Sequence, residues 1–417
     1  MKNFKDSGIE WLGEIPEHWE VVKINKIVTF VNGYAFENFD FNPIFEIPVI
    51  RIGDMQKEKI LYDNCLKTKE KEKLKQFLIS NNDILIALSG ATTGKIAFCD
   101  TDNKAYINQR VAIVRSKLKL VKYYFLTRGF SLLIELACNG SAQPNISTKE
   151  IGEFKIPLPP LKEQEQIAKF LDEKCEKIAN FIEKKEKLIN LLKEQKQVLI
   201  NETITKGLDK NVNFKDSGIE WLGEIPEHWK LIKCKNFFVL KSIPIGDLWN
   251  KTKLLSLTLN GVIERGINNP EGKFPSDFST YQIVKEGDLI FCLFDVAETP
   301  RIIGLSKLNG MITSAYTIFE IKNQEKRFLE YFFIDLDNRK NLKFLYRGLR
   351  NTISKEDLLN LKIPLPPLKE QEQIANFLDS EISKIDKIIE KIKKQIELIK
   401  EYKTILINQA VCGRISL

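Results

Sequence analysis

Histidine and closely spaced cysteine are two chemical resources that this chain largely lacks. Only two histidines, His18 and His228, occur among its 417 residues, which makes a Ser-His-Asp triad or a histidine-rich metal site improbable. The seven cysteines are scattered and form no C-x-x-C pair. This pattern argues against a zinc site or a disulfide framework, and it predicts reduced, mostly buried thiols.

Long apolar runs are also missing. No stretch approaches 18 consecutive apolar residues, so we expect no membrane-spanning segment. The first residues, MKNFKDSGIEWLGE, carry acids and glycines where a signal peptide has a basic start and a continuous apolar stretch, and we therefore expect a cytoplasmic protein. With 43% hydrophobic and 29% charged residues, the chain has a globular composition and enough length for two to four domains.

Sequence motifs for catalysis are absent as well. The segment from Gly90 to Ile96, GATTGKI, has three residues between its glycines and isoleucine after the lysine. A phosphate-binding P-loop needs four residues there and serine or threonine after the lysine. The chain also lacks the Asp/Asn-Pro-Pro-aromatic tetrad that amino-methyltransferases use. We therefore expect a protein that recognises a partner and is not itself an enzyme.

The dominant positive feature is an internal repeat. Residues 3–19 and 213–229 are identical (NFKDSGIEWLGEIPEHW), and so are residues 155–168 and 362–375 (KIPLPPLKEQEQIA). Between these blocks, segments 20–154 and 230–361 have nearly equal length but share little sequence. Two copies of one frame thus carry two different inserts, which suits a scaffold that presents two different recognition surfaces.

The second repeated block opens a predicted long helix in each half. Prolines 157, 159 and 160 exclude helix before Leu161, and neither proline nor glycine follows until Gly207. Apolar residues recur every seven positions, most regularly from Leu378 to Leu406. This period is typical of a coiled coil. We expect the two helices to pack on each other antiparallel, and the alternative is that each packs on a separate core.

The variable segments show short, β-branched runs bounded by turn residues, which predict strands. Predicted strands are 47–52, 83–88, 110–115, 288–294 and 316–321, and Ser147-x-x-Glu150 and Ser354-x-x-Asp357 predict helix starts. The expected fold class is therefore α+β, with two pseudo-symmetric halves. Each half is a β-rich mixed α/β domain followed by a long helix. Expected domains are 1–160, 161–206, 207–367 and 368–417, the second and fourth being the helices.

Charge is unevenly distributed along the chain. The net charge of +8 is concentrated in the variable segments, since residues 20–160 carry +5 and residues 230–367 carry +6, whereas the predicted helices are almost neutral. Basic domains on a neutral rod favour a polyanion as partner, most simply nucleic acid.

The frame DSGIEWLGEIPEHW, a variable segment, IPLPPLKEQEQIA and a heptad helix, all given twice, resembles the specificity subunit of Type I restriction–modification systems. The first insert is similar in its phrases DILIALSGATTGKIAF, INQRVAIVR and NGSAQPNIS, whereas the second, with DLIFCLFDVAETPRIIG, departs in its letters. The resemblance covers the whole chain and implies two target-recognition domains that read the halves of a bipartite, asymmetric DNA site. It also implies that the helix pair acts as a ruler for the unread spacer.

The resemblance implies partners and cofactors too. The expected partners are double-stranded DNA, two methyltransferase subunits and restriction–translocase subunits, with no membrane. No cofactor is expected on this chain, because S-adenosylmethionine, ATP and Mg²⁺ belong to the partner subunits. We expect no catalytic and no metal-binding residues on this chain.

Candidate DNA-binding residues are polar and basic side chains in the loops of the inserts, because such groups reach base edges and phosphates. They are Ser89, Thr92, Thr93, Lys95, Asn108, Gln109, Arg110, Gln143 and Asn145 in the first half, and Arg301, Thr313, Ser314, Tyr316, Arg347, Arg350 and Asn351 in the second. We expect Arg347 and Arg350 to contact phosphates. Asn108 could instead cap a strand, and Thr92 and Thr93 could simply form a turn.

The duplicated tryptophans Trp11, Trp19, Trp221 and Trp229 cannot encode two different DNA sequences, because they are identical in both halves. They either build the common core or bind a methyltransferase subunit. Two other functions compete with DNA recognition. One is a coiled-coil adaptor with two protein-binding domains, and the other is a self-sufficient methyltransferase or nuclease.

Overall fold

The computed structural model describes residues 3–56, 58–100, 102–138, 144–266 and 277–415. The chain forms two compact units. The first comprises residues 1–185 and 394–417, and the second comprises residues 186–393. Each unit therefore contains one variable segment and parts of both long helices.

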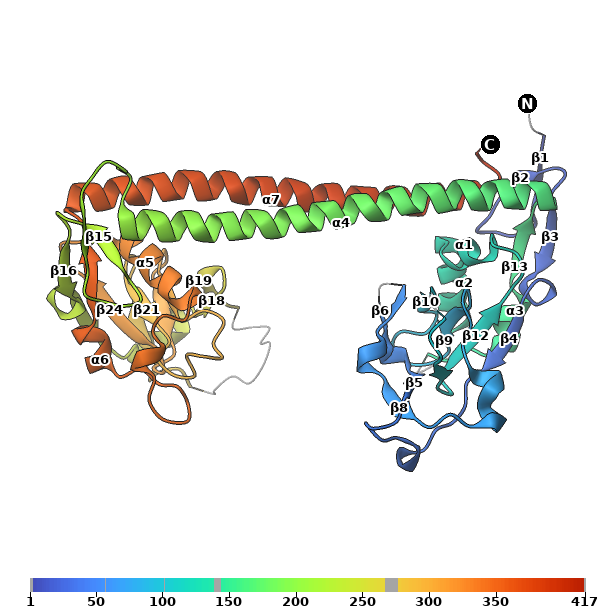
Figure 1. The fold of residues 1–417 in the computed structure, drawn as a ribbon, viewed down its shortest axis with the longest axis horizontal. Helices are drawn as coiled ribbons and strands as arrows, with labels where there is room; N and C mark the ends of the chain where they lie inside the picture. Colours follow the sequence, from blue (N-terminus) through green and yellow to red (C-terminus); the bar gives the residue numbers. More distant parts are fainter. Residues whose placement is uncertain (1–2, 57, 101, 139–143, 267–276, 416–417) are drawn as a thin grey trace. The chain divides into compact units, whose positions relative to one another are not determined.

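The first unit is a mixed domain that leads into the first long helix (Figure 1). Its strands are β1 (Phe4–Asp6), β2 (Glu14–Pro16), β3 (Glu20–Lys23), β4 (Thr29–Asn32), β5 (Ile47–Ile50), β6 (Met55–Gln56), β7 (Lys59–Ile60), β8 (Leu66–Thr68), β9 (Ile84–Ala87), β10 (Ile96–Phe98), β11 (Tyr106–Ile107), β12 (Val111–Arg115) and β13 (Lys155–Leu158). Its helices are α1 (Val121–Phe125), α2 (Arg128–Ala137), α3 (Thr148–Glu153) and the start of α4 (Leu161–Lys206).

The second unit repeats this plan with different details. Its strands are β14 (Phe214–Asp216), β15 (Glu224–Pro226), β16 (Lys230–Lys233), β17 (Phe238–Lys241), β18 (Leu255–Thr258), β19 (Gly261–Glu264), β20 (Gln282–Val284), β21 (Leu289–Phe291), β22 (Ile303–Leu305), β23 (Gly310–Ile312), β24 (Thr317–Ile321) and β25 (Lys362–Leu365). Its helices are α5 (Lys326–Asn338), α6 (Lys355–Asn360) and the start of α7 (Leu368–Val411).

A four-stranded antiparallel sheet lies at the centre of each unit. The strand order is β10-β9-β12-β4 in the first unit. In the second unit the corresponding strands follow in the reverse order, as β17-β24-β21-β22. β9, β12 and β21 consist almost entirely of buried apolar residues, and β24 is buried except at Glu320. This burial on both faces explains why they read as continuous apolar runs and not as alternating ones.

The first strand of each insert, which directly follows the first repeated block, pairs with the start of the second repeated block. β3 runs antiparallel to β13, with Glu20 opposite Leu158, and β16 runs antiparallel to β25 in the same way. This pairing joins the two ends of each insert with the same backbone register in both units, which lets the segment between them vary.

The long helices confirm the predicted heptad pattern. In the first unit, Leu171 of α4 shares a core with Leu406 and Ile407 of α7, whereas in the second unit Ile204 of α4 shares a core with Leu378 of α7. The start of each helix thus packs beside the end of the other, as expected for an antiparallel pair (Figure 1). No helix in the described part of the chain is long and apolar enough to cross a membrane.

The predicted strands occur close to their expected positions, with one informative difference. The expected strand 288–294 is regular only over Leu289–Phe291. After Phe291 the chain no longer pairs with β24. It turns towards the loop before α6, where the amide of Asp295 donates to the carbonyl of Arg350 at 2.8 Å.

Candidate nucleic-acid interface

Three segments of each insert meet at one surface, and the same backbone hydrogen bonds hold them in both units. The amide of Ile146 donates to the carbonyl of Leu88 at 2.9 Å, and that of Ile353 donates to Leu293 at 2.8 Å. These bonds join the end of a central strand to the loop that precedes α3 or α6. The third segment is the turn before β12 in the first unit and before β24 in the second. The amide of Val111 donates to the carbonyl of Asn108 in the first turn, and the amide of Tyr316 donates to that of Thr313 in the second.

In the first unit these segments surround a hollow of about 620 Å³. Its lining includes Ser89, Gln109, Arg110 and Asn145, four of the candidate DNA-binding residues, which we call the first recognition surface. Gln109, Arg110 and Asn145 are exposed, and Ser89 is half-buried beneath them. The Ser89 hydroxyl is buried and has no hydrogen-bond partner among the described residues. The surface thus offers side chains with both donor and acceptor capacity to an incoming group.

The remaining candidates of the first unit have mixed roles. The Thr93 hydroxyl donates to the carbonyl of Gly90 and lies 3.0 Å from that of Pro144, so it fastens two loops together, in agreement with the turn alternative. Thr92 is exposed and Lys95 is half-buried in the same loop. Asn108 is half-buried at the turn, where its carbonyl accepts from Val111. Gln143 lies outside the described residues.

The second unit builds a different surface on the equivalent loops. The Tyr316 ring stacks on Phe294 with centroids 6.2 Å apart and an interplanar angle of 13°, and the Arg350 guanidinium lies 5.6 Å from the Phe294 centroid. We call Phe294, Tyr316, Arg350 and Asn351 the second recognition surface. Aromatic side chains here take the place of the hydroxyl and amide side chains of the first surface, so the two surfaces differ in chemistry.

Ion pairs fix several basic residues of the second unit. Arg350 Nε donates to Asp295 Oδ1 at 2.9 Å, and this bond holds the pKa of the Asp295 carboxyl below its ordinary value. Arg347 pairs with Asp357 at 2.8 Å on the surface. Exposed pairs of this kind are weak, so a phosphate can displace the carboxylate partner. Arg301 differs because its side chain is largely buried, 3.2 Å from the Asn338 side-chain oxygen, which gives it a structural role.

The other polar candidates of the second unit lie near this surface. Thr313 is half-buried and its hydroxyl accepts from the amide of Ala315 at 3.4 Å, whereas Ser314 is exposed. The Asn351 side chain donates to Glu298 at 3.4 Å. Sequence reasoning missed Phe294 and Asp295. The available signal was the position of Phe294 directly after an apolar strand, which is where Ser89 stands in the first half.

The duplicated tryptophans separate into two pairs. Trp19 and Trp229 are fully buried in their cores, in agreement with the core-packing alternative and leaving their side chains no access to a partner. The Trp19 indole donates to Glu163 at 3.1 Å, and His18 lies 2.6 Å from the same carboxylate. Trp229, His228 and Glu370 repeat this arrangement.

Trp11 and Trp221, the second pair, are only partly buried. Trp11 lies beside α2 and the end of α7, at a hollow of about 310 Å³, and Trp221 packs near Phe332. Some of their surface is accessible to a partner.

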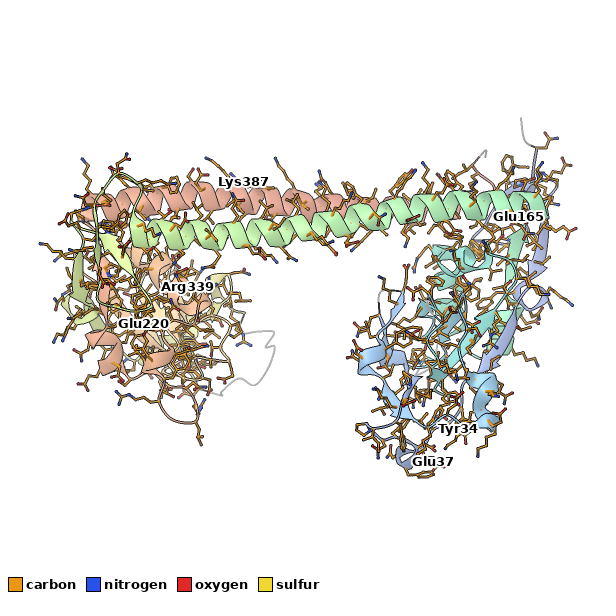
Figure 2. All side chains as sticks on the ribbon, in the orientation of Figure 1. Tyr34, Glu37, Glu165, Glu220, Arg339 and Lys387 are labelled. Atoms are coloured by element: carbon orange, nitrogen blue, oxygen red, sulfur yellow. The ribbon has the colours of Figure 1, made fainter. Side chains whose placement is uncertain are left out.

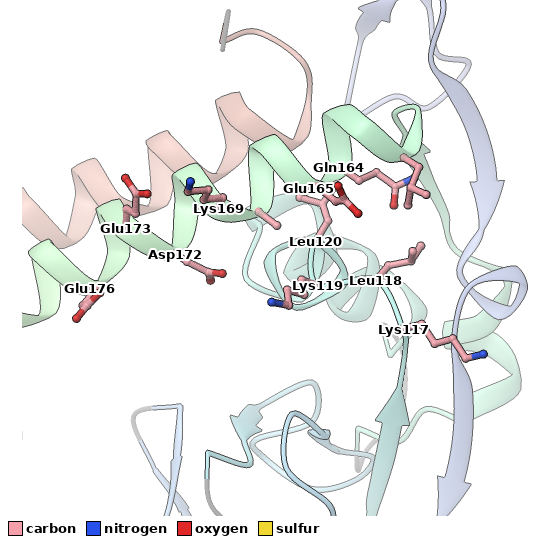
Figure 3. Close-up of a pocket in the computed structure, with 12 residues that line it drawn as sticks. Lys117, Leu118, Lys119, Leu120, Gln164, Glu165, Lys169, Asp172, Glu173 and Glu176 are labelled. Carbon is pink, nitrogen blue, oxygen red and sulfur yellow. The ribbon is translucent and has the colours of Figure 1, made fainter.

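A third hollow in the first unit, of about 490 Å³, lies between the start of α4 and the segment that enters α1 (Figure 3). Lysines and carboxylates both line it, among them Lys117, Lys119, Glu165 and Glu173, and Figure 2 shows Glu165 at the start of α4. None of the candidate DNA-binding residues lines it. We therefore assign it to the junction between domain and helix and not to the recognition surface.

Metal-ligating side chains and cysteine thiols are two kinds of potentially reactive group. No group of three metal-ligating side chains occurs among the described residues. Burial raises the pKa of the Cys65 and Cys99 thiols to about 12, because a thiolate is poorly solvated there, and nearby carboxylates add to the effect. Such thiols are poor nucleophiles at neutral pH.

Two different polar surfaces on one duplicated frame, carried by an antiparallel helix pair, define a two-domain recognition protein. A sequence model described as Type I restriction modification DNA specificity domain matches residues 16–198 and 310–398. The chain belongs to this family of specificity subunits, as its repeated blocks indicated.

Individual relatives agree along nearly the whole chain. The Type I restriction enzyme MjaVIII specificity subunit of Methanocaldococcus jannaschii is 28% identical over 96% of this chain and 94% of its own length. The putative type I restriction enzyme MjaX specificity subunit of the same organism is 30% identical over 99% of this chain and 97% of its own length.

Solved structures share the fold at lower identity. A chain from work on complex assembly and conformational transition of the type I R-M system has a TM-score of 0.67 at 15% identity, over 96% of this chain and 99% of that one. The HsdS subunit of Thermoanaerobacter tengcongensis has a TM-score of 0.50 at 15% identity, over 96% and 98% of the two chains.

Proposed function

We propose that this chain is the DNA-specificity subunit of a Type I restriction–modification complex, in which each unit reads one half of a bipartite, asymmetric DNA site. The observation that carries the proposal is the pair of recognition surfaces. They occupy equivalent loops, and equivalent backbone hydrogen bonds hold them, but their side chains differ. Two readers of this kind specify two unlike half-sites. The adaptor alternative is disfavoured because the relatives are named as specificity subunits.

The division of labour follows from the same features. The chain supplies recognition, and two methyltransferase subunits together with restriction–translocase subunits supply the chemistry, with S-adenosylmethionine, ATP and Mg²⁺ bound to them. In the first unit Ser89, Gln109, Arg110 and Asn145 offer hydrogen bonds to base edges, and a bidentate contact discriminates between bases by about 1–3 kcal/mol. In the second unit the planar stack offers flat surfaces and a guanidinium. We propose that the complex acts in the cytoplasm.

The test is a methylation map. The full chain is expressed with the methyltransferase subunit of its locus in an unmethylated host, and N6-methyladenine is mapped by sequencing. One bipartite motif is expected. Asn145→Ala should relax base preference in one half of that motif, and Tyr316→Ala should relax it in the other half. Each variant serves as the control for the other.

A binding assay separates the remaining possibilities. The complex should bind DNA with an affinity that falls steeply with salt, because phosphate contacts release counterions. A soluble complex that neither methylates nor binds DNA would overturn the proposal. A motif that relaxes in both halves with either variant would overturn the assignment of one half-site to each unit.

A further inference from the structure

The connection between α5 and α6 is the most basic loop of the second unit. Residues 339–352 contain Arg339, Lys340, Lys343, Arg347 and Arg350 and no acidic residue. The whole connection between α5 and α6 has 16 residues, whereas the matching connection between α2 and α3 has 10. The second unit therefore carries a basic extension that the first lacks. Such a segment favours a polyanion.

Leu349 stands at the tip of this connection. Its side chain is fully exposed, the most exposed among the large apolar side chains of the described residues. The loop that carries it is closed at its base, because Arg347 and Thr352 exchange backbone hydrogen bonds of 2.9 and 3.0 Å. Gly348 and Asn351, on either side of the tip, adopt positive φ values of 66° and 43°. The backbone thus turns sharply and presents an apolar side chain to solvent.

Backbone hydrogen bonds hold the loop in place, since Arg347 and Thr352 close its base. The exposed ion pairs Arg350–Asp295 and Arg347–Asp357 lie on each side of the tip and can be released to a phosphate. The amide of Asp295 also donates to the Arg350 carbonyl at 2.8 Å. Little conformational entropy then remains to be lost when the loop binds a partner. In Figure 1 this is the orange loop at the lower edge of the second unit, beside α6.

The tip adjoins the second recognition surface. Arg350, the residue next to Leu349, is the same guanidinium that lies over Phe294, and Phe294 stacks on Tyr316. Proteins that kink DNA insert apolar side chains between base steps while neighbouring arginines and lysines contact the backbone. An exposed leucine flanked by two arginines, within a segment without acidic residues, has this composition.

We propose that Leu349 inserts between adjacent base pairs of the half-site bound by the second unit and unstacks them. The inference rests on the proposed function and deepens it. The second unit then recognises how easily a base step opens in addition to the pattern of base edges. The first unit, whose connection is six residues shorter, has no described counterpart of this side chain.

The experiment uses the full chain with its methyltransferase subunits and duplexes that carry the motif found by methylation mapping. The fluorescent base 2-aminopurine, which brightens when unstacked, replaces bases one at a time along both half-sites, except at the adenines that the methyltransferase subunits extrude for methylation. We expect one bright step in the half-site that Tyr316→Ala relaxes. Leu349→Ala should abolish this signal and weaken binding about tenfold, which corresponds to the loss of roughly two buried methylene groups. Leu349→Met should retain both.

Leu259→Ala is the matched control, because Leu259 is also an exposed leucine of the second unit but lies in the turn between β18 and β19. Neither substitution removes a buried contact, so both variants should fold. If Leu349→Ala keeps the bright step and the affinity, the inference is overturned while the proposed function stands. A bright step confined to the other half-site would also overturn it. If the unmodified complex does not bind its motif, both proposals fail.

Discussion

Replacing Glu370 with alanine tests how the frame is fastened to its helix. The Glu370 carboxylate, near the start of α7, accepts from the fully buried Trp229 indole at 3.1 Å and contacts His228 at 2.8 Å. The substitution leaves a buried N–H without an acceptor, which costs about 1–3 kcal/mol. It also removes a negative charge from the first turn of a helix, worth about 0.3–1 kcal/mol. We expect the second unit to lose about 1.3–4 kcal/mol of unfolding free energy.

Glu370→Gln keeps an oxygen acceptor and should cost less than half as much. Denaturant unfolding gives the free energy, and hydrogen exchange of peptides unique to each unit locates the loss. Glu163→Ala should give a similar loss in the first unit, because Trp19 and His18 contact Glu163 in the same way.

A double-mutant cycle sharpens the test of this fastening. Trp229→Phe removes the indole N–H, so adding Glu370→Ala to that variant should cost clearly less than Glu370→Ala alone. Strict additivity in the cycle, or a loss below about 0.5 kcal/mol for Glu370→Ala, would refute the reasoning.

Three further predictions concern recognition and stability. Arg110→Ala should lower affinity for the methylated motif by about 5- to 150-fold, because a lost bidentate contact is worth about 1–3 kcal/mol; competition binding with single-base variants should show relaxation in one half-site only. Gly207→Ala should destabilise the second unit by about 1–2 kcal/mol, since φ is +76° and the new Cβ would lie 3.1 Å from Glu370; thermal unfolding checks this. Burial raises the pKa of the Glu330 carboxyl above its ordinary value of 4.5. The contribution of Glu330 to the unfolding free energy is therefore fully present below pH 4.5 and is lost as the pH rises towards the raised pKa. Glu330→Gln should therefore be more stable than the parent at pH 7 and lose this advantage below pH 4; unfolding measured across this pH range tests the sign.

Local sequence patterns were enough to predict the two long helices, the starts of α3 and α6, and five of the strands, β5, β9, β12, β21 and β24. The prolines before Leu161 and the seven-residue spacing from Leu378 to Leu406 both act within one element, so they can be read without knowing the fold. The apolar run 110–115 likewise gave β12 to within one residue. The pairing of β3 with β13 could not be read in this way, because it joins residues more than 130 positions apart.

The candidate surface was only partly predictable for the same physical reason. Ser89, Arg110 and Asn145 were identified from residue type and turn position, and the structure brings them together. Thr93 and Arg301 have the same polar character, but their roles depend on partners distant in sequence. The Thr93 hydroxyl lies within hydrogen-bond distance of the Pro144 carbonyl, and the Arg301 guanidinium donates to the Asn338 side-chain oxygen. Residue type indicates which groups a side chain can contact, whereas tertiary contacts decide whether it remains free to do so.

The residue ranges that make up the two units also affect the order in which the chain folds during synthesis. The second unit is a continuous stretch, residues 186–393, so all its parts have been made once residue 393 has left the ribosome. The first unit begins at residue 1 but includes residues 394–417, and Leu406, Ile407 and Ala410 share a core with Leu12 and Trp19. The half that is translated first must therefore wait for the last part of the chain. In arrested nascent chains, protease resistance should appear in the second unit before the first, so that the later-made domain is the earlier one to mature.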